Sequence, residues 1–217
     1  MTEIYLVRHG YSKSNEMDVF LGQKNVDLTE KGVNQATETA KFLNAFDITK
    51  IYASDLDRTC QTAEPLSKLK GLPIVKRERL REIDGGDWDW VSYKEIGEKY
   101  PNDWRLWGVD VCSSYTPNGE TFYQVQQRVY AEMENIACEN DGKQVAVYSH
   151  GTSIKSFICK VLNVTGKIAN DLPYPSNASV TKLIYENGKF TIDFYSKADF
   201  LGDLSTNLTI NVEGEII

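Results

Sequence analysis

Histidine and cysteine are both sparse in this chain, and their scarcity limits the chemistry that it can perform. Only two of the 217 residues are histidine, and the four cysteines are widely spaced with no C-x-x-C pair. Structural zinc sites need closely spaced Cys and His ligands, so the sequence predicts no metal centre. Free thiols are the expectation, and they indicate a reducing compartment, the cytoplasm; the residues concerned are Cys60, Cys112, Cys138 and Cys159.

Long apolar runs and excess positive charge are also missing. No apolar stretch approaches the roughly 18 residues of a membrane span, and the start MTEIYLVRHG lacks the pattern of a signal peptide. Lys and Arg number 24 against 31 Asp and Glu, for a net charge of −7. Nucleic acids and anionic membranes bind basic surfaces, so we expect neither as a partner. Because a pocket can concentrate a few arginines, a small anionic substrate is compatible with this charge.

Strand-like and helix-like segments alternate along the chain. We expect strands at residues 3–8, 50–54 and 143–149, an extended segment at 73–83, and helices near 30–43, from 58, at 120–139 and after 150. Asn187-Gly188 lies between two β-rich runs and is typical of a hairpin turn. This order predicts one domain over 1–217 of the α/β class. Its expected form is a three-layer α/β/α sandwich with a mainly parallel central sheet and an antiparallel edge hairpin.

Apolar spacing also predicts which helical residues face the core. In the helix after Thr29, such residues recur at intervals of three and four, so we expect Val33, Ala36, Ala40 and Leu43 to point inward. In the following helix, Pro65 is expected to kink or shorten the element. No pattern indicates an oligomeric state.

Polar clusters follow several of the expected strands. They are Arg8-His9-Gly10, the segment from Ser54 to Arg58, and Ser149-His150-Gly151. Ligands of open α/β sheets bind at the carboxyl ends of the strands, so these clusters are expected to converge. Arginine binds phosphate through paired charged hydrogen bonds, and neutral histidine can act as a nucleophile or base. Each cluster alone is typical of a turn or a salt bridge, but together they predict a phosphoryl-transfer site without a metal.

The segment LVRHGYSKSN resembles the R-H-G-x-[ST]-x-x-N signature of the histidine phosphatase superfamily, the cofactor-dependent phosphoglycerate mutase-like proteins. Other segments similar to that family follow in its order: SDLDRTCQTA, RLREIDGGDWD, NGETF and VYSHGTS. The resemblance spans about residues 3–160, and the hairpin matches later strands of the family. It implies a phosphoglycerate mutase-like fold and hydrolysis of a small phosphorylated metabolite without a cofactor.

The resemblance also implies a role for individual residues. His9 would be the nucleophile that becomes phosphohistidine, and Glu82 would donate a proton to the leaving alcohol and then activate water. Arg8, Arg58 and His150 would surround the phosphoryl group and neutralise its charge. Further phosphate contacts would come from Ser12, Asn15, Gly22, Gly151 and Thr152.

Phosphoglycerate mutase is the alternative activity within this family. Family mutases carry a longer insert after the acid, with a pair of arginines further on. Residues 84–117, which form a lid-like insert over the site in this family, contain no Arg-Arg pair, and this favours a phosphatase. The same segment holds all four tryptophans, which either shape the substrate pocket or pack the insert onto the domain: Trp88, Trp90, Trp104 and Trp107.

Two functions outside this mechanism are compatible with parts of the sequence. DLDRT at 55–59 matches the D-x-D-x-T motif of haloacid dehalogenase-like phosphatases, in which Asp55 would be the nucleophile and Mg²⁺ the cofactor. This reading leaves both His-Gly pairs unexplained. A non-enzymatic phosphate-binding protein is disfavoured because both histidines, both arginines and Glu82 are present.

Overall fold

A six-stranded sheet forms the centre of the computed structural model, which describes residues 1–206; residues 207–217 of the expected domain lie outside the described residues. The strand order is β3-β2-β4-β1-β5-β6. The parallel part comprises β1 (Thr2–Arg8), β2 (Ile48–Ala53), β3 (Ile74–Lys76) and β4 (Gln144–Ser149). The antiparallel hairpin of β5 (Val180–Glu186) and β6 (Lys189–Lys197) adds to β1 at one edge. The predicted mainly parallel sheet with an edge hairpin is confirmed.

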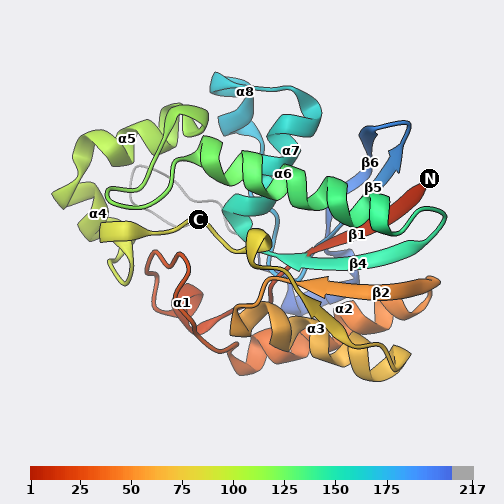
Figure 1. The fold of residues 1–217 in the computed structure, drawn as a ribbon. Coiled ribbons are helices and arrows are strands. Elements are labelled where there is room, and N and C mark those ends of the chain that lie inside the picture. The colour runs from red at the N-terminus through yellow and green to blue at the C-terminus, as the bar shows by residue number, and fades with distance from the viewer. Residues whose placement is uncertain (207–217) are drawn as a thin grey trace.

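Helices cover both faces of the sheet, as expected for a three-layer sandwich (Figure 1). Helices α2 (Glu30–Asn44) and α3 (Asp57–Lys70) pack on one face, and α6 (Phe122–Glu139) and α7 (Gly151–Leu162) pack on the other. Alternate residues of a strand point to opposite faces. In β1, Tyr5 and Val7 therefore join the core under α2 and α3, and Ile4 and Leu6 join the core under α6 and α7.

The prediction for the buried face of α2 is wrong at Val33, which is 51% exposed. The buried face instead includes Gln35 and Thr39, because the helix is rotated so that these polar residues turn toward the sheet. Their polar atoms are satisfied there. Gln35 accepts a hydrogen bond from the Tyr11 amide at 2.8 Å, and Thr39 donates to the Ala178 carbonyl at 2.8 Å. Buried polar groups with partners do not carry the cost of unpaired ones.

Helix α3 does not stop at Pro65 but continues to Lys70. It ends at Gly71, whose φ of 66° lies in the left-handed region that glycine adopts without strain. Helix α6 begins at Phe122, slightly later than predicted, because Thr121 caps it by accepting the Gln124 amide and Gln124 caps Thr121 in return.

The prediction of an extended segment over residues 73–83 is mostly wrong. Only Ile74–Lys76 pairs with β2; the chain then forms a short 3₁₀ helix, Glu78–Leu80, and leaves the sheet. The residues that follow lie in a loop, because no further strand residue is available to pair with them. This departure from the sheet brings Glu82 to the carboxyl ends of β1 and β4.

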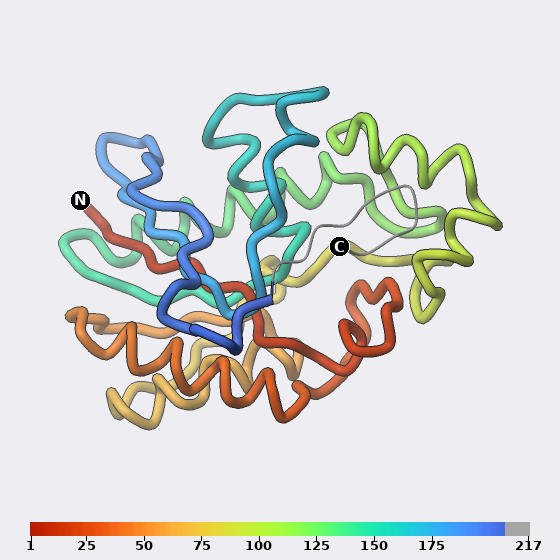
Figure 2. Tube along the Cα trace, turned by 180° about the vertical axis from the view of Figure 1, so that it is seen from behind, coloured from red at the N-terminus to blue at the C-terminus, as the bar shows by residue number. Residues whose placement is uncertain are grey.

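Residues 84–117 lie at the carboxyl end of the parallel strands (Figure 1). They contain α4 (Tyr93–Lys99), α5 (Pro101–Val109) and the 3₁₀ turns Gly86–Trp88 and Val111–Ser113. Figure 2 shows this segment beside the red loop that contains α1 (Lys13–Glu16), and Phe20 and Val91 share a backbone hydrogen bond of 2.9 Å. The remaining helical elements are α8 (Gly166–Asp171) and the 3₁₀ turn Asp199–Leu204. Within residues 1–206, no helix has the length and apolar character needed to cross a membrane.

Candidate active site

The two histidines meet at the carboxyl ends of neighbouring strands. Arg8 of β1 pairs in register with Ser149 of β4, so the next residues, His9 and His150, leave the sheet side by side. Their ring centroids are 5.3 Å apart. Both are buried, His9 with 5% and His150 with 0% of its surface exposed. The predicted convergence of the first and last clusters is therefore present in the fold.

Hydrogen bonding sets the protonation of His9. Its Nδ1 lies 2.8 Å from the Gly10 carbonyl oxygen. Because a carbonyl only accepts, Nδ1 carries the proton, and Nε2 keeps its lone pair. Burial, and then the charges of Arg58 and Arg8, lower the pKa of His9 well below 6.5. His9 is thus a neutral imidazole whose Nε2 does not carry the proton.

His150 is held by a residue to which the sequence assigned no role. Its Nε2 lies 2.9 Å from the hydroxyl of Ser54, and the Ser54 amide donates to the Tyr148 carbonyl at 2.9 Å. Among the described residues, Nδ1 of His150 is buried without a hydrogen-bond partner. Burial, followed by the charge of Arg58, lowers its pKa well below 6.5. Ser54 directly follows β2 and belongs to the second polar cluster, so its approach to this site was expected, but its contact with His150 was not.

Both imidazoles are expected to remain neutral in the folded protein at pH 6, where a free histidine is mostly protonated. The unfolded chain then binds more protons than the folded one below pH 6.5, so the free energy of unfolding should decrease as pH falls below 6.5. An NMR titration of the imidazole nitrogens measures the two pKa values directly. The signals can be assigned because the chain has two histidines and His9→Ala leaves one. An imidazole that titrates near pH 6.5 in the folded protein would contradict the prediction.

Two buried guanidinium groups flank the histidines. Arg58 is 2% exposed and donates to the carbonyls of Lys24 and Gly22, each at 2.8 Å. Burial lowers its pKa to about 10. Arg8 donates to the Pro175 carbonyl at 2.6 Å, and its Nε is buried without a hydrogen-bond partner among the described residues. Buried cations require an anionic partner to offset desolvation, so this arrangement suits a phosphate.

The side chain of Glu82 reaches from its loop to the first turn of α7, the helix that begins directly after His150. Its carboxylate accepts the amides of Thr152 at 3.0 Å and Ser153 at 3.1 Å, and also the Ile83 amide at 2.9 Å. The partial positive charge of a helix N-terminus favours an acidic side chain there. Glu82 is buried but also lines the cavity described below.

The residues expected to supply further phosphate contacts have partners within the protein. Ser12 donates from its hydroxyl to Asn15 Oδ1 at 2.9 Å. The Gly22 amide donates to Asp89 at 2.7 Å, and the Thr152 amide is taken by Glu82. Gly151 lies against Arg8, where an added Cβ would be 3.5 Å from the guanidinium carbon. Their roles toward phosphate stay predictions.

Asn177 is a site residue that sequence reasoning missed. It is fully buried, and its amide group donates to the His9 carbonyl at 3.1 Å and to Asn15 Oδ1 at 3.2 Å. It therefore ties the segment before β5 to both motif residues. Asn177 lies in an irregular segment without periodicity, so no local pattern pointed to it.

A small cavity of about 60 Å³ opens beside Glu82. Arg8, Glu82, Gly151 and Thr152 form its polar side, and the other lining residues are Phe20, Leu21, Tyr93, Trp107 and Tyr174. Of the four tryptophans, Trp107 contributes to this wall, Trp88 and Trp104 pack in the core, and Trp90 is half-exposed. Trp107 also belongs to the same core cluster, so packing accounts for three of the four tryptophans, and a role in shaping a substrate pocket stays a prediction for Trp107. Within residues 1–206, no three His, Cys, Asp or Glu side chains gather as a metal site.

Comparison with known proteins places the chain in a family. The sequence profile of the histidine phosphatase superfamily (branch 1) matches residues 4–197. Phosphoserine phosphatase 1 of Hydrogenobacter thermophilus is 33% identical over 164 residues, which are 76% of this chain and 78% of that protein. The probable phosphoglycerate mutase GpmB of Proteus mirabilis is 30% identical over 190 residues, 86% of each chain.

A solved structure agrees with this relationship. YhfR of Bacillus stearothermophilus superposes with a TM-score of 0.88 at 29% identity, over 93% of this chain and 100% of that one. The resemblance seen in the motifs is therefore confirmed, together with the phosphoglycerate mutase-like fold. The chain belongs to the histidine phosphatase superfamily, branch 1.

Proposed function

We propose that this protein hydrolyses small phosphomonoesters in two steps through a phosphohistidine on His9. The observation that carries the proposal is the neutral His9, with Nε2 free of the proton, near two buried guanidinium groups whose charges act on it. Nε2 attacks phosphorus, and the bond from phosphorus to the ester oxygen breaks. The acid form of Glu82, once its side chain has left the α7 amides, gives its proton to the leaving alkoxide.

The second step returns the enzyme to its starting state. Glu82, now ionised, takes a proton from water as the water oxygen attacks phosphorus. The bond from phosphorus to Nε2 breaks, inorganic phosphate leaves, and Glu82 is again protonated. Arg8 and Arg58 offset the charge on the phosphoryl oxygens in both steps, and the neutral His150 adds a polar group on the same side. The steps use no metal and no cofactor.

Hydrolysis is favoured over the mutase reaction by the charge around the cavity. Arg8 is the only cationic residue that lines it among the described residues, and residues 84–117 contain no Arg-Arg pair to hold a second acidic group. With one cation and aromatic walls, the cavity suits a leaving alcohol that carries no second acidic group. We propose that residues 84–117 cover the site as a lid. The phosphoserine phosphatase among the relatives supports a small phosphorylated metabolite as substrate.

The haloacid dehalogenase-like alternative is disfavoured by the surroundings of Asp55. Arg81 binds both of its carboxylate oxygens, with Nε donating to Oδ1 at 2.7 Å, and this hydrogen bond lowers the pKa of Asp55. The carboxylate is thus occupied by an ion pair. A cytoplasmic location and the absence of nucleic-acid partners belong to the proposal, on the grounds of the unpaired thiols and the net charge of −7.

Phosphate release from a generic aryl phosphate in excess EDTA is the first test. Wild-type protein is expected to keep its activity, because no proposed step involves a metal, and Asp55→Asn is expected to keep it as well. Activity that EDTA abolishes and Mg²⁺ restores, and that Asp55→Asn also removes, would overturn the proposal in favour of an aspartate nucleophile.

A further inference from the structure

The loop that carries Glu82 is held in place by side chains instead of a strand ladder. Buried backbone carbonyls outside helices and strands need hydrogen-bond partners from side chains or water. In this loop, four consecutive carbonyls accept hydrogen bonds from side chains of other elements. Arg128 donates to the carbonyls of Arg79 at 2.9 Å, Arg81 at 2.6 Å and Glu82 at 2.8 Å. The Ser149 hydroxyl donates to the Leu80 carbonyl at 2.7 Å and the Ser153 hydroxyl to the Arg81 carbonyl at 2.7 Å. The Gln23 side chain donates to the Glu82 carbonyl at 3.2 Å.

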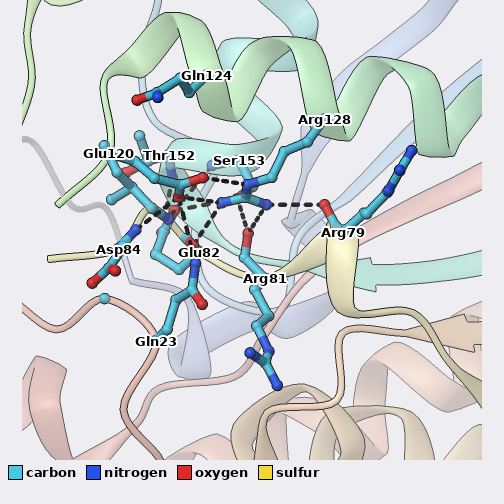
Figure 3. A network of polar contacts seen from close by, with 12 residues as sticks. Gln23, Arg79, Arg81, Glu82, Asp84, Glu120, Gln124, Arg128, Thr152 and Ser153 are labelled. Atoms are coloured by element: carbon cyan, nitrogen blue, oxygen red, sulfur yellow. Dashed lines mark hydrogen bonds and ion pairs between the residues drawn. The ribbon is translucent and has the colours of Figure 1, made fainter.

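Arg128 makes the largest share of these contacts, as Figure 3 shows. It extends from α6 across to the loop, and its two terminal nitrogens donate to the carbonyls of Arg79, Arg81 and Glu82. Its Nε and Nη2 also donate to the two carboxylate oxygens of Glu120, each at 2.8 Å. A guanidinium has five N–H donors in a fixed plane, and all five are used here. Lysine has neither the number of directed donors nor the planar geometry to replace it.

Glu120 connects Arg128 to the other side of the loop. Its Oε2 accepts the Asp84 amide at 2.9 Å and the Gln23 side chain at 3.4 Å. Burial raises the pKa of Glu120, but the hydrogen bond and charge of Arg128 outweigh it, and the net shift is downward. The carboxylate is thus ionised beside the guanidinium. Gln23 follows Gly22, whose carbonyl binds Arg58, so the same cluster joins the two halves of the site.

We propose that Arg128 is a positioning residue for acid–base chemistry, and that with Glu120 it fixes the main chain on both sides of Glu82. This inference rests on the proposed role of Glu82. When the Glu82 side chain leaves the α7 amides to reach the leaving oxygen, the clamped main chain keeps its range of positions small. A misplacement of about 1 Å can cost about 100-fold in rate. Arg128 acts through Glu82 and does not touch the reacting atoms.

The kinetic test compares Arg128→Gln with Arg77→Gln. Arg77 also links to carboxylates of α6, Glu132 at 3.4 Å and Glu139 at 2.6 Å, but it does not contact the Glu82 loop through them. With an alkyl phosphate, whose leaving oxygen needs a proton, we expect kcat/KM to fall about 100-fold in Arg128→Gln and to stay near wild type in Arg77→Gln. Inhibition by inorganic phosphate should be unchanged, because Arg8 and Arg58 are untouched. Arg128→Lys should not restore the rate.

A double variant separates positioning from a general structural effect. If Arg128 acts only through Glu82, adding Arg128→Gln to Glu82→Gln should cause little further loss with the alkyl phosphate. A full additional loss in the double variant would overturn the proposal. Equal losses of kcat/KM with alkyl and aryl phosphates in the single variant would overturn it as well, because kcat/KM reports the step in which the leaving group departs. Should Arg128→Gln fail to fold, Glu120→Gln is expected to produce a smaller loss of the same kind.

Hydrogen exchange tests the clamp without relying on activity. The amides of Ile83 and Asp84 are expected to exchange at least several-fold faster in Arg128→Gln, while those of β1 keep their wild-type rates. Unchanged exchange at both amides would overturn the positioning role, even in a protein with no phosphatase activity. Faster exchange combined with a Glu82→Gln variant that loses no activity would instead leave the clamp standing and refute the proposed role of Glu82.

Discussion

Replacing His9 with alanine is expected to lower phosphate release by roughly 10⁴-fold or more, the scale seen when an enzyme loses its nucleophile. The imidazole supplies the only atom in the proposed site that forms a bond to phosphorus in the first step. Nε2 keeps its lone pair because Nδ1 donates to the Gly10 carbonyl, and burial together with the charges of Arg58 and Arg8 disfavours the protonated ring. Steady-state release of phosphate from an aryl phosphate measures this loss.

Trapping of the phosphoenzyme gives an independent check on the role of His9. Rapid quenching of wild type with radiolabelled substrate should trap one acid-labile phosphoryl group per chain, and His9→Ala should trap none. His150→Ala removes the neighbouring imidazole and is expected to form the phosphoenzyme more slowly, because Nε2 of His9 is still present. A labelled His9→Ala protein, or one that keeps near-normal turnover with an intact fold, would refute the mechanism.

Replacing Glu82 with glutamine is expected to separate the two chemical steps. General acid–base catalysis contributes roughly 10²–10⁴-fold, so hydrolysis of an alkyl phosphate should fall by about that factor. An aryl leaving group departs without a proton, and its release in the first turnover should change little. The second step still needs Glu82 as base, so an aryl phosphate should give a burst of one equivalent of phenol followed by slow turnover. Stopped-flow absorbance measures both phases.

Glu78→Gln is the matched control for this variant. Glu78 lies on the same loop and forms an exposed ion pair with Arg81, so its replacement removes the same charge away from the cavity. It is expected to leave both phases unchanged. Equal losses in the rate of the first turnover with alkyl and aryl phosphates in Glu82→Gln would show that this residue does not act as the acid. The amide side chain in Glu82→Gln keeps an oxygen that accepts an α7 amide, so the local fold is retained.

The positions of the main strands and the edge of the sheet at which the site lies could be predicted from sequence, because strand segments depend on local signals. Apolar runs with turn residues at their ends mark β1, β2 and β4, and parallel strands bring their carboxyl ends to one edge. Arg8, His9, Arg58 and His150 follow those ends, so their meeting needs only the strand order. The family motifs then supplied an expected role for each.

The contacts that hold the site depended on tertiary structure. Ser54 on His150, Asn177 on His9, and Gln35 in the core are polar residues whose partners lie far away in the chain. No periodicity encodes such a partner, because it depends on how two separate elements pack and on the angle at which a side chain leaves each of them.

The Glu82 loop is the clearest case of this division. Its motif predicted that Glu82 is the acid, but β-rich residues around it predicted an extended segment where only Ile74–Lys76 joins the sheet. Beyond that point the carbonyls have no neighbouring strand, and Arg128 of α6 reaches them from a helix that is distant in sequence. The sequence by itself determined which residues are candidates for the chemistry. Packing of α6 against the loop decided how Glu82 is held, because a guanidinium contacts three carbonyls only once both elements are in place.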